Sequence, residues 1–329
     1  MSDRATYNSL LVAKLEATIG TDSTPVPATD AIQLLDWFDP SGDATIQKQR
    51  DKAIVGNSFQ GLPPLKPTGY VGTWSSLFYA RGPRNGLLIS SSNLPDLDPY
   101  YISSGLSSTI VTTGGSESVT YKPASTSLKS ITEKFYTDGK MRALFGARTD
   151  LQFSLEAGGP LEVTAARTGL YQGDSDVALP AGAVFGTTDP AIADSSISFT
   201  IDSYSAGVFR KFTWGTGNKI ESGRGSLNAT TGGIAPPSLR DRMLPFTCAF
   251  EEDLVATKDA EGWRKSNTPI AISFTLGTVQ YNKHLFTAPL AKVEKVQVSN
   301  DNGTQVITVS GHLWDSVPAN NDAFSLKVF

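Results

Sequence analysis

Few side chains in this sequence of 329 residues could do chemistry. It holds two histidines, His284 and His312, and a single cysteine, Cys248. A metal centre needs several such ligands at a regular spacing, and a serine triad of the esterase type needs a G-x-S-x-G turn, which is missing. Cys248 stands in an apolar run, residues 243–250, which is typical of a small core side chain rather than a nucleophile. The sequence therefore predicts no catalytic residue, no cofactor and no metal site.

Two further groups of residues could hold a ligand. The acidic run at residues 251–253 could supply a carboxylate pair for glycoside hydrolysis, but the solvated end of a strand is the favoured interpretation. Five tryptophans could form a platform for sugars, yet they are dispersed among core positions, which favours packing or interface roles. These tryptophans are Trp37, Trp74, Trp214, Trp263 and Trp314.

Composition and charge exclude several classes of protein. Charged residues make up 18% of the chain, the net charge is −4 and the pI is about 5.3, so no basic face for gripping nucleic acid is predicted. A mild acidic excess suits solubility, and it also suits a surface that must repel a polyanion. One cysteine allows no intrachain disulfide. No basic-then-apolar leader and no long apolar run is present, so we expect no passage across a membrane by a standard route.

The elements that must position these residues are mostly strands. Alternating apolar residues, as at Leu151, Phe153 and Leu155, predict half-buried antiparallel strands. Asp138-Gly139 and Asn302-Gly303 predict hairpin turns. The sequence thus predicts a mainly β protein, an antiparallel sandwich or barrel.

A few segments carry other signals. Residues 8–19 are expected as a short helix or an extended apolar arm, and residues 74–80 as a helix. Residues 39–69 are polar and rich in Pro and Gly, so a long loop is expected there. A helix is also expected either at residues 253–259 or just after them, near Trp263.

The chain is expected to divide into two domains, residues 1–172 and 196–329, joined by a linker at 173–195 that is rich in Gly, Ala, Asp and Pro. A weak internal repeat supports this division. The pattern Y-x-x-G-x-x-R-x-L at residues 136–144 returns as Y-x-x-G-x-x-R-x-F at 204–212, and Asp150 then corresponds to Asn218. Chance similarity between two hairpins and a duplication both stay open.

Three stretches together resemble the major tail tube proteins of long-tailed bacteriophages. Residues 13–25 run Ala-Lys-Leu-Glu-Ala-Thr-Ile-Gly-Thr-Asp-Ser-Thr-Pro and lead to Ala31-Ile32, which is similar to the start of that family. The strand–turn–strand block at residues 136–158, with 169–171, is similar to its middle. Gly277-Thr278, Asn282, residues 288–291 and Asn302-Gly303 are similar to its closing segment.

The resemblance implies a β-sandwich flanked by a helix, whose sheets join those of neighbouring subunits in stacked rings around a channel for DNA. It implies a non-enzymatic virion protein, assembled in the host cytoplasm, with itself and other tail proteins as partners and only transient contact with DNA. Families with two copies of the fold form trimeric rings, and the repeat favours a trimer here, while a hexamer with an added domain stays open. Residues 8–30 and 39–69 would bridge successive rings.

Two other functions stay open. The chain could be a different virion β-protein, such as a tail-tip, distal or head-decoration protein. It could also be a carbohydrate-binding module for receptor recognition that uses the tryptophans and acidic residues above. Self-assembly into tubes, copy number in the particle and glycan binding separate the three.

Overall fold

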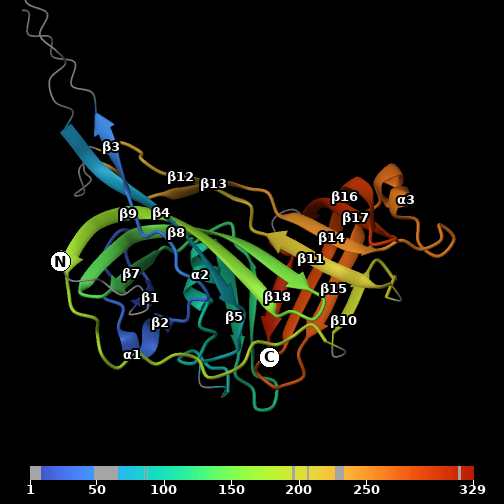
Figure 1. Cartoon of the computed structure of the whole chain (residues 1–329), viewed down its shortest axis with the longest axis horizontal. Coiled ribbons are helices and arrows are strands. Elements are labelled where there is room, and N and C mark those ends of the chain that lie inside the picture. Colours follow the sequence, from blue (N-terminus) through green and yellow to red (C-terminus); the bar gives the residue numbers. More distant parts are fainter. Residues whose placement is uncertain are drawn as a thin grey trace, which may run out of the picture.

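The computed structural model describes residues 9–47, 66–84, 86, 88–194, 197–205, 207–226, 233–317 and 320–329. It is elongated, with the N-terminal half at one end of the long axis and the C-terminal half at the other (Figure 1). Strands β8 (Lys140–Glu156) and β9 (Leu161–Asp176) run from the first half toward the second. Antiparallel β structure dominates, as the sequence predicts, and the helices are short.

The described part of the first half holds the two long strands just named, seven others and two helices. Preceding β8 along the chain are β1 (Ser9–Leu15), α1 (Pro27–Asp30), β2 (Ala31–Ile32), β3 (Asp43–Gln47), β4 (Lys66–Tyr79), α2 (Asp98–Ser103), β5 (Leu106–Val111), β6 (Ser118–Pro123) and β7 (Ile131–Thr137).

The described part of the second half holds nine strands and one helix. They are β10 (Ser198–Ile201), β11 (Phe209–Gly215), β12 (Asn218–Glu221), β13 (Ser238–Arg242), β14 (Pro245–Glu251), α3 (Ala260–Ser266), β15 (Ile270–Leu276), β16 (His284–Asp301), β17 (Thr304–Trp314) and β18 (Ser325–Val328).

Sixteen of the described strands belong to one antiparallel sheet, and β8 joins its two halves. The beginning of β8 pairs with β7, its end pairs with β11, and β9 accompanies it along nearly its whole length. From β11 the sheet continues through β14, β17 and β16 to β18, which returns to pair with β6 of the first half. The two halves therefore share a hydrogen-bonded sheet.

The larger of two hydrophobic clusters among the described residues also extends through both halves. Phe153 of β8 stacks on Trp214 of β11 with ring centroids 4.5 Å apart and an interplanar angle of 4°. Trp214 in turn lies 4.5 Å from the ring of Phe286 on β16. Stacked aromatic rings of this size bury much apolar area, so this contact ties the halves together strongly.

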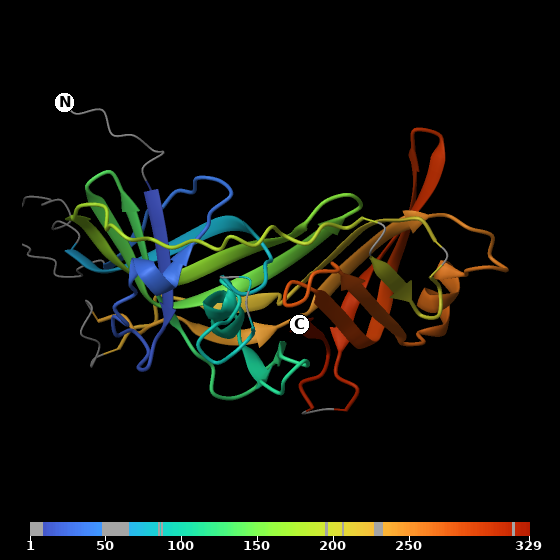
Figure 2. The ribbon, with the colours of Figure 1, turned by 90° about the horizontal axis from the view of Figure 1, so that it is seen from below.

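The segment expected as a linker begins inside β9 and then runs as an extended strap over the outside of the molecule (Figure 2). Backbone hydrogen bonds hold it at intervals, from Val184 N to Pro27 O, from Thr187 N to Arg84 O and from Ala193 N to Gly159 O. Residues 173–195 contain four aspartates and no Lys or Arg, so the net charge of this segment is −4. The net charge of the whole chain is also −4. The remainder of the chain is therefore neutral overall.

The helix expected at residues 74–80 is wrong. Residues 74–80 form no helix, because Trp74, Ser76 and Phe78 point into the core from β4 while the residues between them face outward. The apolar residues at 74, 77 and 78 have helical spacing only because Leu77 lies on the outer face. Pairing of β4 with β9 along residues 71–79 fixes the period of two.

Other expectations are settled by the element bounds. Residues 8–19 contain the extended alternative, β1, and α3 fits the later of the two positions expected for a helix near Trp263. The expected loop at 39–69 is wrong at residues 43–47 and 66–69, where β3 pairs with the start of β4. Residues 48–65 lie outside the described part.

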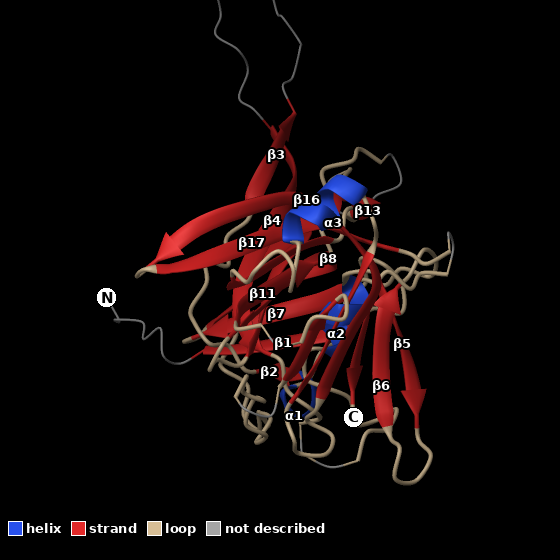
Figure 3. Cartoon of the chain, turned by 90° about the vertical axis from the view of Figure 1, so that its right-hand side faces the viewer, coloured by secondary structure: helices blue, strands red, loops and turns tan. Residues whose placement is uncertain are grey.

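Hairpins project from the body in different directions (Figure 3). The β3–β4 hairpin points one way and the end of the β16–β17 hairpin another, while β5 and β6 lie along a third side. The turn of β16–β17 is made by Asn302 and Gly303 with φ of 52° and 90°, as their types predict.

Candidate assembly surface

The residues considered for catalysis do not come together. Cys248 is buried in β14, and burial raises the pKa of its thiol far above the usual value, so it is not a thiolate. His284 is buried at the start of β16, while Nδ1 of His312 lies 2.8 Å from Glu294 Oε1 at the surface. Among the described residues no three His, Cys, Asp or Glu side chains are grouped to hold a metal ion.

The acidic residues after β14 have separate partners. Arg210 Nη2 donates to Glu251 Oε1 at 2.8 Å, and the hydroxyl of Tyr204 donates to Asp253 Oδ2 at 3.1 Å. Both carboxylates are thus paired with residues of the neighbouring segment 204–210. This agrees with the strand-end interpretation of residues 251–253.

Most of the tryptophans are structural. Trp74 and Trp214 are buried in the core, and Trp263 of α3 is nearly so. Trp37 and Trp314 are half exposed, at 50% and 52%. Only these two could serve as contact surfaces for another molecule.

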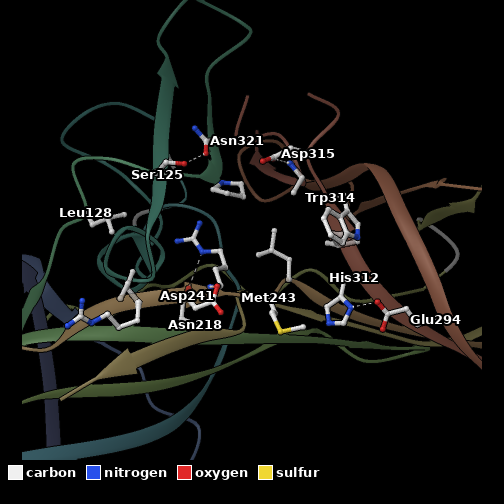
Figure 4. A pocket seen from close by; sticks show the side chains of 18 residues that line it. Ser125, Leu128, Asn218, Asp241, Met243, Glu294, His312, Trp314, Asp315 and Asn321 are labelled. Atoms are coloured by element: carbon white, nitrogen blue, oxygen red, sulfur yellow. Dashed lines mark hydrogen bonds and ion pairs between the residues drawn. The ribbon is translucent and has the colours of Figure 1, made fainter. Parts of the chain in front are cut away.

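Trp314 lines a groove of about 490 Å³ where the two halves meet (Figure 4). One wall comes from residues 123–128 of the first half, and the other from β13, the middle of β16 and the end of β17. Met243, Trp314 and His312 face into it, and Lys292 Nζ lies 5.6 Å from the Trp314 ring centroid. The lining of the groove combines the aromatic ring of Trp314 with carboxylates, which include those of Glu294 and Asp315.

The outer face of the large sheet carries an unusual set of side chains. Seven adjacent strands, β4, β9, β8, β11, β14, β17 and β16, turn one set of alternate side chains to the core and the other set outward. The outward set is dominated by short uncharged side chains, which we call the hydroxyl band. The band consists of Thr73, Ser75, Gln152, Ser154, Thr164, Ala166, Thr168, Thr213, Thr247, Ala249, Gln297, Thr308 and Ser310.

Strand register places these side chains in rows across both halves. In one row Ser154 of β8 is opposite Thr213 of β11, which is opposite Thr247 of β14, which is opposite Ser310 of β17. Charged residues lie in the same rows: Glu162 of β9 is opposite Ser154, and Lys295 of β16 is opposite Ser310. Lys211 of β11 is opposite Ala249, and its Nζ pairs with Glu156. The band is therefore a wide surface of short hydrogen-bonding side chains with charged residues between them.

The resemblance motif near the N-terminus forms a clasp. Glu16 is buried, and its carboxylate accepts hydrogen bonds from the Ser130 hydroxyl at 2.6 Å, the Thr132 hydroxyl at 2.9 Å and the backbone N–H of Gly146 and Gly20, both at 2.7 Å. Buried carboxylates are costly unless paired in this way.

The rest of the motif secures the same turn. Asp22 forms an ion pair of 2.7 Å with Lys134 of β7, and its other oxygen accepts from Thr24 N at 2.7 Å. The chain after β1 is thereby fixed to β7. The motif is a structural device that sets the direction of the N-terminal segment.

A comparison with protein families identifies the family to which this chain belongs. Residues 6–313 match the family described as phage tail tube protein, a stretch that includes both halves, the clasp and the hydroxyl band. The chain belongs to the phage tail tube protein family. A comparison with curated protein sequences gave no match.

The tail tube protein is accordingly a component of the virion tail, in a family of structural proteins that assemble with themselves and contact other tail proteins. No helix among its described residues is long and apolar enough to span a membrane. Sequence reasoning did not find the hydroxyl band, because its alternating Ser and Thr look like the polar face of any strand until register aligns them.

Proposed function

We propose that this tail tube protein assembles into stacked rings around a channel through which DNA passes, in the tail of a long-tailed phage. The observation that carries the proposal is the large sheet that extends through both halves and keeps one broad face uncovered by its own chain. A closed tube needs such a face to line its channel and needs strands at the edges to join neighbours.

Edge strands are available for that joining. In the described sheet β5, β10 and β3 each pair with only one neighbour. Ser107, Ser108 and Thr109 of β5 are exposed. Pairing such edges between subunits closes the ring and removes surfaces that otherwise aggregate.

We further propose that the chain carries two copies of one fold, residues 1–172 and 196–329, and forms trimeric rings, with a hexamer as the alternative. Two features support a duplication. The long hairpin β8–β9 of the first half has a counterpart in β16–β17 of the second. A short helix packs against the first strand of each, α2 against β8 and α3 against β16.

Stacking of rings would involve the segments that project from the body. Residues 8–30, fixed in direction by the clasp, and the β3–β4 hairpin within residues 39–69 are two candidates. The exposed arm at the end of β16–β17, residues 297–305, is a third.

Electron microscopy of the purified protein and of isolated tails tests the proposal. Tubes or rings with a hollow axis are expected, with threefold or sixfold symmetry giving the subunit number. A protein that stays monomeric under all conditions, and that is a minor component of the particle, would refute it.

A carbohydrate-binding role is the second candidate, because Trp314 presents a half-exposed indole in a groove with carboxylates. Glycan binding that is lost in Trp314→Ala and kept in Trp37→Ala would favour it. A screen without glycan binding would remove it.

A further inference from the structure

We infer that the exposed turn after β14 is a knob that fills the groove of a second copy of this chain, head to tail, and that this contact joins one ring to the next. The knob consists of Leu254 and Val255, and the groove is the one lined by Trp314. This inference rests on the proposed function. It names two surfaces that meet between rings and the apolar chemistry of their contact.

The knob is the most exposed apolar feature of the described part of the chain. Leu254 is 75% exposed and Val255 is 73% exposed, more than any other large hydrophobic side chain among the described residues. Two adjacent aliphatic side chains in water gain free energy when another molecule covers them. The turn therefore presents a surface that favours contact.

The turn that carries the knob is held in one conformation. The backbone N–H groups of Thr257 and Lys258 both donate to Leu254 O at 2.8 Å. Lys258 Nζ also forms an ion pair of 2.8 Å with Asp202. A knob that is fixed before binding loses little conformational entropy when it docks.

The groove offers a matching apolar surface. Met243 and Trp314 are each more than half exposed and face into it, with Leu128 on the other wall (Figure 4). Aromatic and Met side chains are enriched at protein interfaces. The groove volume of about 490 Å³ is in the range of sites that bury a small ligand, so two aliphatic side chains would fit in it.

Charge favours the same pairing. Residues 251–259 contain four acidic residues and one lysine, a net charge of −3. The first-half wall of the groove lies between Lys122 and Lys129, both exposed, and contains no acidic residue. Arg240 and Arg242 line the other wall. An acidic turn that enters the groove therefore meets basic side chains on both sides.

The three carboxylates that line the groove have contacts of their own. Glu294 Oε1 lies 2.8 Å from His312 Nδ1. Asp315 Oδ1 accepts from Ala323 N at 2.8 Å, and Asp241 Oδ1 accepts from the next backbone N–H at 2.8 Å. These contacts offset part of the repulsion that the carboxylates exert on an acidic turn.

The knob and the groove lie at opposite ends of one strand. Met243 precedes the start of β14 at Pro245, and Leu254 follows its end at Glu251. β17 runs antiparallel to β14 and ends at Trp314, beside that same start. Edge pairing within a ring leaves the strand ends for the neighbouring rings. A copy shifted along β14 brings its knob to the groove, and such a head-to-tail contact repeats without closing.

Cross-linking in assembled tubes tests the contact directly. The variant Met243→Cys with Val255→Cys puts a thiol on each surface, while the native Cys248 is buried. The two thiols of one copy are separated by the seven residues of β14, roughly 20 Å or more, too far for a short bis-maleimide. Treated tubes should give a ladder of linked subunits that continues beyond six. Either single-cysteine variant should give no ladder.

Substitution measures how much the contact contributes. Leu254→Ser with Val255→Ser should raise the protein concentration needed for tubes roughly tenfold or more, because two apolar anchors are lost. Trp314→Ala should have an effect of similar size. Both variants should unfold near the wild-type temperature, since the replaced side chains are at least half exposed. Val279→Ser, at a position that is 64% exposed, is the matched control and should assemble normally.

The outcomes separate the inference from the function on which it rests. A ladder that ends at three or six subunits would place the contact within a ring. No ladder, or knob variants that assemble as the control does, would remove the contact. Each of these results overturns the inference and leaves the tube intact. Tubes that still bind a glycan through Trp314 would also overturn it, because the groove would then be open. Failure of the wild-type protein to form tubes would instead strike the proposed function.

Discussion

Arg167 and Glu133 form a fully buried ion pair in the first half of the molecule. Arg167 Nη2 donates to Glu133 Oε1 at 2.8 Å and Nε donates to Oε2 at 3.0 Å. The hydroxyl of Tyr100 donates to the same carboxylate at 3.0 Å, and that of Ser76 accepts from Arg167 at 2.9 Å. The pair thus links β9, β7, α2 and β4 through a network in which each charge has several partners.

Removing one member of this pair should destabilise the fold strongly. Arg167→Met leaves the Glu133 carboxylate buried without its counter-ion, which is expected to cost about 3–5 kcal/mol in the free energy of unfolding. The double variant Glu133→Leu and Arg167→Met should lose less than Arg167→Met alone. Arg240→Met, which breaks an exposed pair with Glu221, is the control and should cost at most about 1 kcal/mol. Urea denaturation measures all three, and equal losses for Arg167→Met and Arg240→Met would contradict this account.

His284 should make the protein sensitive to acid. Neither ring nitrogen has a hydrogen-bond partner among the described residues, and burial lowers the pKa of His284 from 6.5 to about 4. The unfolded chain takes up the proton first as pH falls, so the stability contributed by neutral His284 is present above pH 6.5 and lost between pH 6.5 and 4. The loss is on the order of 3 kcal/mol. His284→Leu should abolish that part of the slope, and parallel curves for the two proteins would disprove it.

Asp98 should act in the opposite direction. Burial raises its pKa from 3.8 to about 6, although the Tyr121 hydroxyl donates to it at 2.8 Å and opposes the rise. The stability of the protonated form is present below pH 3.8 and is lost as pH rises to 6. Asp98→Asn keeps an acceptor for Tyr121 without the charge, so it should stabilise the protein at pH 7 by up to about 3 kcal/mol. The advantage should disappear below pH 4, and a pH-independent difference would exclude this cause.

Gly217 should tolerate no side chain. Its φ is +54°, and a Cβ there would lie 1.6 Å from the backbone oxygen of Met243. Gly217→Ala should therefore cost more than about 4 kcal/mol or prevent folding. Gly115→Ala has a similar positive φ, +84°, but open space around it, so the backbone conformation alone should cost about 1–2 kcal/mol. Thermal unfolding that shows the same loss in both would mean that the contact with Met243 relaxes freely.

Shortening the β16–β17 arm should separate folding from assembly. Deleting the two opposed pairs Asn300–Gln305 and Asp301–Thr304 keeps the Asn302-Gly303 turn and the facing of every remaining residue. The variant should unfold near the wild-type temperature, because these residues are exposed or nearly so, but should form tubes poorly. A full-length control with Asn300→Ser and Gln305→Ser should still assemble. Normal tubes from the shortened protein would remove the arm from the contacts between rings.

Local sequence signals predicted much of this fold. Alternation at Leu151, Phe153 and Leu155 and the Asp138-Gly139 turn gave the correct strands and hairpin, since both depend on neighbours in sequence. The helix expected at residues 74–80 failed because pairing of β4 with β9 overrode local spacing. α2 was missed because its six residues, Asp98–Ser103, are too few to show a periodic pattern.

The candidate surface could be predicted far less. Thr213, Thr247 and Ser310 are separated by 34 and 63 residues, and only the register of β11, β14 and β17 puts them in one row. The clasp at Glu16 is different, because the resemblance already marked its residues although their contacts with Ser130 and Gly146 needed the three-dimensional structure. Pairing between residues far apart in the sequence thus accounts for most of the features that the sequence did not predict.

The sharing of β8 between the halves has a mechanical meaning. One strand hydrogen-bonded to β7 at one end and β11 at the other makes the connection between the two halves stiff, and the Phe153–Trp214 stack stiffens it further. A tail built from such subunits has to bend at the joints between them, as a chain of stiff links does. In the proposed tube, the projecting segments would then set how far the tail bends, while the channel of each ring would keep its width.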